Sequence, residues 1–189
     1  WLEANRLGGV SILADEIATI DNLGQWPTPE IENTDEQLTI TSSMPSSLVL
    51  AQMIIDFAEI GKPVTINTCR VPLIIFAEAA RRATTSKGFK LKWVVDGIMI
   101  EGICGSGWSD INIPAQYKSS SASVMITSHN SERPPTAAIY DERFNYSLSN
   151  GMIVDPECWN VINQLAKTTL VPSSIHSRAS AGAEVDDSN

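Results

Sequence analysis

Three neighbouring side chains near the C-terminal end, those of His176, Ser177 and Arg178, could together bind an anion. The planar guanidinium group of arginine donates paired hydrogen bonds to a carboxylate or a phosphate. The three residues lie in 173–189, a segment of mostly small residues that would let a ligand or another stretch of backbone approach closely. Composition alone favours a disordered tail. The alternative is a segment that is ordered around a ligand or against the rest of the protein.

Cys104 is the other candidate, because it stands directly before the glycine-rich run 105–107. A nucleophilic cysteine requires a base or a positive field that stabilises the thiolate, and the neighbouring sequence supplies neither. The run could bind an anion through its backbone N–H groups, but it lacks the lysine of the phosphate loop and the third glycine of the dinucleotide motif. Cys104 is therefore a candidate ligand contact, and the competing interpretation is a buried cysteine before a tight turn.

Metal and triad chemistry are not indicated by the sequence. The chain has two histidines and three scattered cysteines, without the spacing of metal ligands. A nucleophile-elbow motif for a Ser-His-Asp hydrolase is lacking as well, and paired acids such as Asp141-Glu142 are most simply solvated. We expect no metal and no cofactor, and the sequence leaves open whether the chain is an enzyme.

The charge pattern excludes one class of partner. The net charge is −9, and residues 1–60 contain ten acidic residues against a single basic one, Arg6. Nucleic-acid binding requires clustered lysine and arginine, and Arg81-Arg82 is the only adjacent pair. No apolar run reaches the roughly 18 residues that a membrane span requires. An odd number of dispersed cysteines fits a reducing compartment, so we expect an acidic, cytoplasmic protein that binds neither nucleic acid nor membrane.

Hydrophobic periodicity and turn signals predict intermixed helices and strands, hence an α+β fold with helices packed on a mostly antiparallel sheet. The expected helices are 10–20, 46–60, 73–83 and 156–167, and the expected strands are 38–41, 63–69, 89–95, 98–103, 122–128, 136–140 and 144–148. Asp96-Gly97 between two β-rich runs is a strong hairpin signal. Asp155 is expected to cap the last helix, and 21–36 and 105–110 are expected to be loops.

Length and composition suit a single domain over 1–189. The opening residues 1–9 resemble the last turns of a helix that stops at Gly8-Gly9. We therefore expect a fragment whose natural start is missing, and any N-terminal targeting signal would have been lost with it.

The two ends of the chain resemble an uncharacterised family of proteobacterial proteins, a domain of unknown function. The opening Trp-Leu-Glu-Ala-Asn-Arg-Leu-Gly-Gly is similar to a helix near the start of its members, and 169–189 is similar to the pattern with which members end. The matching tail positions are Pro172, Ser177, Arg178, Gly182 and Asp187, whereas Ala181 replaces a usual glycine. The resemblance implies no established activity, but it favours an ordered tail.

Two functional hypotheses follow. In the first, the chain is an intracellular enzyme or binding protein for an anionic small metabolite held by Arg178, with His176, Ser177 and Cys104 as further contacts. In the second, it is a non-catalytic interaction protein, homo-oligomeric, whose tail 173–189 docks on its own body or on a neighbouring subunit. The reaction and the substrate are not readable from these residues.

Overall fold

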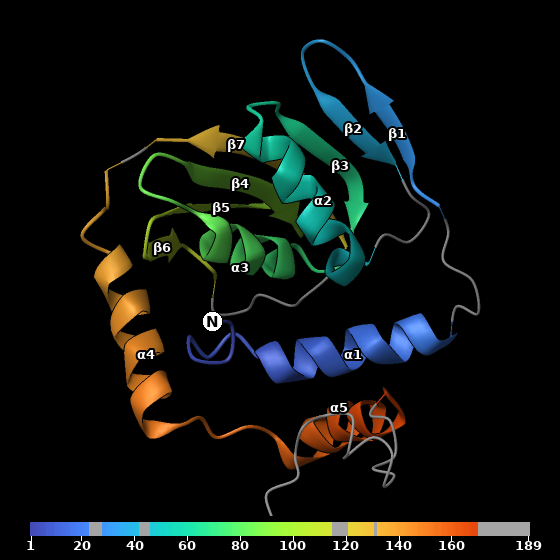
Figure 1. Ribbon diagram of the computed structural model, residues 1–189, viewed down its shortest axis with the longest axis vertical. Helices are drawn as coiled ribbons and strands as arrows, with labels where there is room; N and C mark the ends of the chain where they lie inside the picture. The colour runs from blue at the N-terminus through green and yellow to red at the C-terminus, as the bar shows by residue number, and fades with distance from the viewer. Residues whose placement is uncertain (23–27, 42–45, 115–120, 131, 170–189) are drawn as a thin grey trace, which may run out of the picture.

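The computed structural model describes residues 1–22, 28–41, 46–114, 121–130 and 132–169 (Figure 1). The described residues form five helices and seven strands. In chain order these are α1 (Gly9–Asn22), β1 (Glu30–Asn33), β2 (Leu38–Thr41), α2 (Ser47–Glu59), β3 (Val64–Cys69), α3 (Pro72–Arg82), β4 (Gly88–Val95), β5 (Ile98–Gly105), β6 (Trp108–Ile111), β7 (Ala122–His129), α4 (Ala137–Asn150) and α5 (Pro156–Thr169).

The strands form one sheet in the order β1-β2-β3-β7-β4-β5-β6. Only β2 and β3 pair in parallel, and α2 provides the crossover that a parallel pair requires. The other pairs are antiparallel, with β7 inserted between β3 and β4. The fold is therefore α+β with a mostly antiparallel sheet, as the sequence predicted.

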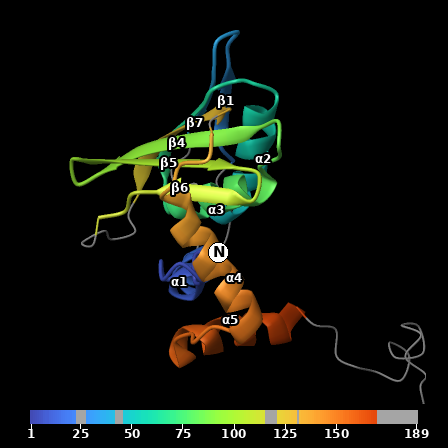
Figure 2. The same ribbon diagram turned by 90° about the vertical axis from the view of Figure 1, so that its left-hand side faces the viewer.

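One face of the sheet is covered by α2 and α3 (Figures 1 and 2). Alternate residues of the strands point into this layer and are fully buried: Leu38, Ile40, Val64, Ile66, Phe89, Leu91, Trp93, Val124 and Ile126. The intervening residues form rows on the opposite face, and one row runs through Thr39, Thr65, Met125, Lys92 and Glu101. This alternation is typical of a sheet with one buried and one solvated face.

Local signals in the sequence predict most of these elements correctly. The hairpin of β4 and β5 turns at Asp96 and Gly97, whose φ angles of 51° and 77° suit this tight connection. Pro72 occupies the first turn of α3, where its missing N–H costs no hydrogen bond. The carboxylate of Asp155 accepts the backbone N–H of Cys158 at 2.9 Å and caps α5 as predicted.

Four local predictions are wrong. Residues 136–140 and 144–148 are not strands, because 137–150 form the single helix α4. The predicted loop 105–110 contains β6, which pairs with β5, and the predicted loop 21–36 contains β1.

The α4 helix forms because its long-range partners favour it over a strand. Its first turn buries Ala137, and the hydroxyl of Tyr140 donates to the backbone oxygen of Ile111 at the end of β6. Gly151, with a φ of 78°, ends the helix, and its N–H donates to the backbone oxygen of Ser147 at 2.9 Å. Tertiary contacts thus override an ambiguous local pattern.

A buried ion pair ties α1 to the beginnings of α2 and α3. Glu16 is 0% exposed, and its carboxylate accepts hydrogen bonds from Arg70 and from Ser46, both at 2.7 Å. These partners stand at the beginnings of α3 and α2, so the contact ties three helices together. Helix α5 in turn packs along α1 (Figure 1). None of the helices in the described ranges combines the length and apolar character that a bilayer-spanning helix needs.

Candidate functional site

A groove of about 820 Å³ lies between α3 and α4, with α2 at one side and the β5–β6 turn at the other. Its volume is in the range of small-molecule sites in proteins. Aromatic and aliphatic side chains make up most of its wall, and a few charged groups converge on it. The residues that carry the following argument are Trp1, Ala77, Glu78, Arg81, Trp108, Asp141 and Phe144.

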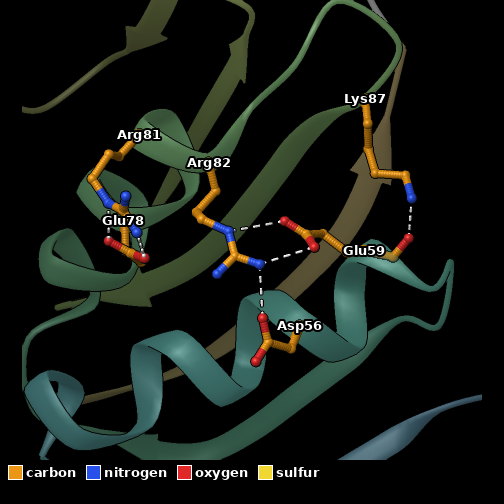
Figure 3. Close-up of polar contacts among 6 residues, drawn as sticks. All are labelled: Asp56, Glu59, Glu78, Arg81, Arg82 and Lys87. Carbon is orange, nitrogen blue, oxygen red and sulfur yellow. Dashed lines mark hydrogen bonds and ion pairs between the residues drawn. The ribbon is translucent and has the colours of Figure 1, made fainter.

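The α3 wall combines open space with one ion pair. Ala77 and Ala80 face the groove and leave room above the helix. Arg81 donates to both carboxylate oxygens of Glu78, at 2.6 and 2.8 Å, and Figure 3 shows this fork. The hydrogen bonds from Arg81 hold the pKa of Glu78 below its usual range. The Arg81 side chain is still 66% exposed, so a ligand in the groove can reach it.

A second set of ion pairs positions α3 against α2. Arg82 bonds Asp56 at 2.8 Å and Glu59 at 2.9 Å, which are one turn apart on α2. Lys87 donates to the backbone oxygen of Glu59 (Figure 3). Because α2 and α3 both line the groove, this network fixes the spacing of two of its walls.

The α4 wall contributes Asp141, Phe144 and Asn145. Asp141 is ion-paired with Arg133, and its side chain is 17% exposed. Burial raises the pKa of the Asp141 carboxyl above its usual range, although the charge of Arg133 opposes this effect. The helix is fixed at its start by the Thr136 hydroxyl, which donates to the Asp110 carboxylate at 2.8 Å.

Two indole rings complete the groove. The ring of Trp108 lies over Gly105, its partner across the β5–β6 hairpin. Trp1 stacks on Tyr140 at 5.7 Å between ring centroids, with an interplanar angle of 13°, and meets Phe76 edge to face at 5.5 Å. Offset and edge contacts of this kind orient aromatic rings specifically.

The described residues that line the groove suit it to ligand binding rather than to nucleophilic chemistry. Both thiols of the sheet layer are buried, and burial raises the pKa of Cys69 to about 11 and that of Cys104 to about 12. Neither thiol lines the groove. The charged lining groups, Glu78, Arg81 and Asp141, are each ion-paired.

Of the site residues predicted from the sequence, only Cys104 lies in the described part of the chain, and it does not line this groove. Arg178, His176 and Ser177 lie outside the described residues, as does the tail 173–189 that was expected to dock. Cys104 ends β5 with 1% exposure, and its thiol contacts the backbone oxygen of Phe89 at 3.7 Å. Its role as a ligand contact stays a prediction.

Sequence reasoning missed the groove itself. Asp141 looked like one of a solvated acidic pair, and its burial depends on packing that no local pattern contains. Trp108 is the one sequence signal that could have pointed to the groove, because an aromatic residue directly after Gly-Ser-Gly places a large side chain at a turn. In the sequence, the adjacent pair Arg81-Arg82 indicates only a local positive charge.

Comparisons of the chain with models of known protein families, with curated proteins and with solved structures gave no match. The resemblance of 1–9 and 169–189 to a proteobacterial family therefore stays a prediction.

Proposed function

We propose that the protein binds a flat, largely apolar small molecule of neutral or positive charge in the groove between α3 and α4. The observation that carries this proposal is an 820 Å³ groove with the indoles of Trp1 and Trp108 and the ring of Phe144 on its walls. Rigid aromatic walls with a few polar groups are typical of sites that select ring-shaped ligands.

The charge of the ligand follows from the lining groups. Glu78 and Asp141 contribute two negative charges, and Arg81 contributes one positive charge. An amine or another cation would gain mainly from the faces of the indole rings, because both carboxylates are already ion-paired. An anion would have to compete with Glu78 for Arg81, whose guanidinium already makes two hydrogen bonds to that carboxylate.

An anionic metabolite bound by Arg178 and His176 stays a separate prediction, because those residues lie outside the described part of the chain. A reducing, cytoplasmic location is also part of the proposal. It is supported by Cys69, Cys104 and Cys158, which are all free thiols.

Ligand-observed NMR with indole, tryptamine and indole-3-acetate tests the binding function. We expect tryptamine to bind more tightly than indole and indole-3-acetate to bind least. The Ala77→Phe variant places a ring in the groove and should abolish binding. Ala18→Phe, on the exposed side of α1, is the matched control and should bind like the wild type. Equal signals from Ala77→Phe and the wild type would refute the groove as the site.

A second function, association between copies of the chain, is favoured by the exposed apolar side chains of α4, α5 and their connection. They are Ile139, Tyr146, Leu148, Met152, Ile153, Trp159 and Val161, and Ile153 is 99% exposed. Many exposed apolar side chains in one stretch of a chain are a feature of interaction surfaces. Light scattering after size exclusion should give an oligomer for the wild type and a smaller mass for Leu148→Glu. A monomeric wild type at high concentration would rule this association out.

A further inference from the structure

A second hollow, of about 970 Å³, lies on the opposite flank of α4 from the groove. It is bounded by the opening turn of the chain, by the last turns of α4 and by the residues after that helix. The argument uses Arg6 from the opening turn, Arg143 from α4, and the two glutamates Glu3 and Glu142.

The two arginines of this hollow differ from the other described arginines. Four arginines are ion-paired with carboxylates: Arg70, Arg81, Arg82 and Arg133. Within the part of the chain that the structure describes, Arg6 and Arg143 are the two arginines without an ion pair, and both line the same hollow. An exposed unpaired guanidinium is ordinary, but two that face one hollow form a pair of planar donors for an anion.

The backbone at Arg6 gives an independent reason to assign a role to its side chain. The N–H of Leu7 donates to the backbone oxygen of Leu2 and the N–H of Arg6 to that of Glu3, both at 2.9 Å, and this pattern ends the opening helical turn as a Schellman motif. Arg6 occupies the left-handed position of the motif with a φ of 61°, where glycine is the favoured residue. The sequence predicted this stop at Gly8-Gly9, two residues later.

A non-glycine residue in this conformation destabilises the backbone, and such residues concentrate at ligand-binding positions. Arg6 lines the same hollow as Arg143. Glycine at position 6 would satisfy the turn better, so the turn by itself does not account for an arginine.

The glutamates of the hollow determine which anion fits. The carboxylate of Glu3 accepts the backbone N–H of Val10 at 2.9 Å and is thereby engaged at the start of α1. Glu142 is exposed at the rim. The two positive and two negative side chains leave the hollow without a net positive charge, so it does not offset the larger desolvation cost of a dianion such as phosphate.

We propose that this hollow is a binding site for a small organic carboxylate, whose oxygens accept hydrogen bonds from the guanidinium groups of Arg6 and Arg143. The site is separate from the groove, because α4 stands between them: Asp141, Phe144 and Asn145 face the groove, and Glu142, Arg143 and Tyr146 face the hollow.

The test is an NMR titration of the arginine Nε–H signals with acetate, at an ionic strength held constant with chloride. We expect saturable shifts of the Arg6 and Arg143 signals and none at Arg70, which is engaged with Glu16. Arg143→Gln should weaken acetate binding by about tenfold or more.

Arg6→Gly should also weaken acetate binding by about tenfold while raising the melting temperature, because glycine relieves the left-handed strain. A loss of binding in this variant therefore cannot result from misfolding. Lys62→Gln, which removes a cation that bonds Asn33 at the end of β1, is the control and should bind acetate like the wild type. The proposal is overturned by the absence of saturable shifts, by unchanged binding in both arginine variants, or by tighter binding of inorganic phosphate than of acetate.

Discussion

Replacing Gly105 with alanine should displace the Trp108 ring from the wall of the groove. The two residues pair across the β5–β6 hairpin. A Cβ atom at position 105 would lie 2.5 Å from Cε2 and 2.6 Å from both Cζ2 and Nε1 of the indole. Ordinary contacts of a Cβ atom begin at 3.4 Å, so the ring has to move by about 1 Å.

The magnitude follows from two opposed effects on the free energy of unfolding. Overpacking of this kind costs about 1–3 kcal/mol. Alanine also restricts the unfolded chain, which stabilises the fold by about 0.4–1 kcal/mol where the backbone accepts it. Gly105 is not among the glycines with positive φ, so its backbone does accept alanine. We expect a net loss of about 0.5–2 kcal/mol in stability and about fivefold weaker binding of tryptamine, because an aromatic contact is worth about 1 kcal/mol.

The assay is ¹⁹F NMR of protein labelled with 5-fluorotryptophan, together with urea unfolding and tryptamine titration. The Trp108 signal should shift in Gly105→Ala, whereas the Trp159 signal on α5 should not. Gly97→Ala in the β4–β5 turn is the matched control, since its Cβ meets nothing within 4 Å, its φ of +77° is strained and it does not line the groove. This control should lose stability and retain tryptamine binding. The reasoning is refuted if Gly105→Ala retains both the Trp108 signal and the affinity for tryptamine.

Further predictions concern the buried ion pair, the groove carboxylate and the thiols. Glu16→Gln should lower the free energy of unfolding by about 2–4 kcal/mol in urea denaturation, because it breaks a buried pair. The raised pKa of Asp141 implies that its proton binds more tightly in the folded state, so tryptamine affinity should fall as the pH is lowered through that pKa, which lies above 3.8. Asp141→Asn should remove this part of the pH dependence in a titration series. A thiol-reactive disulfide reagent should modify Cys158 in the native protein, whereas Cys69 and Cys104 should react only after denaturation.

The elements that the sequence predicts correctly are fixed by local patterns, whereas the features that it misses depend on long-range packing. The helices α2 and α3 were predictable because their apolar residues repeat with helical spacing, as in Leu50, Ile54 and Ala58. The β4–β5 hairpin was predictable because Asp96-Gly97 specifies its own turn. In each case the information lies within a dozen residues.

The misassigned α4 and the groove depend on partners far along the chain. Helix α4 is stabilised by bonds from Tyr140 to Ile111 and from Thr136 to Asp110, which no window around 137–150 contains. The groove is assembled from four separate segments and from Trp1. Aromatic and charged residues in these segments looked ordinary one by one, because their roles arise only when the segments meet.

The insertion of β7 between β3 and β4 also sets the order in which the sheet can form. During synthesis, β2 with β3 and β4 with β5 and β6 can pair before residue 122 exists, but they remain two separate ribbons with facing unpaired edges. Only β7 joins them, through antiparallel pairing to β3 on one side and to β4 on the other. Closure over such sequence distances is slow, and open edges recruit other chains. We therefore expect the nascent chain to be prone to aggregation until β7 has left the ribosome.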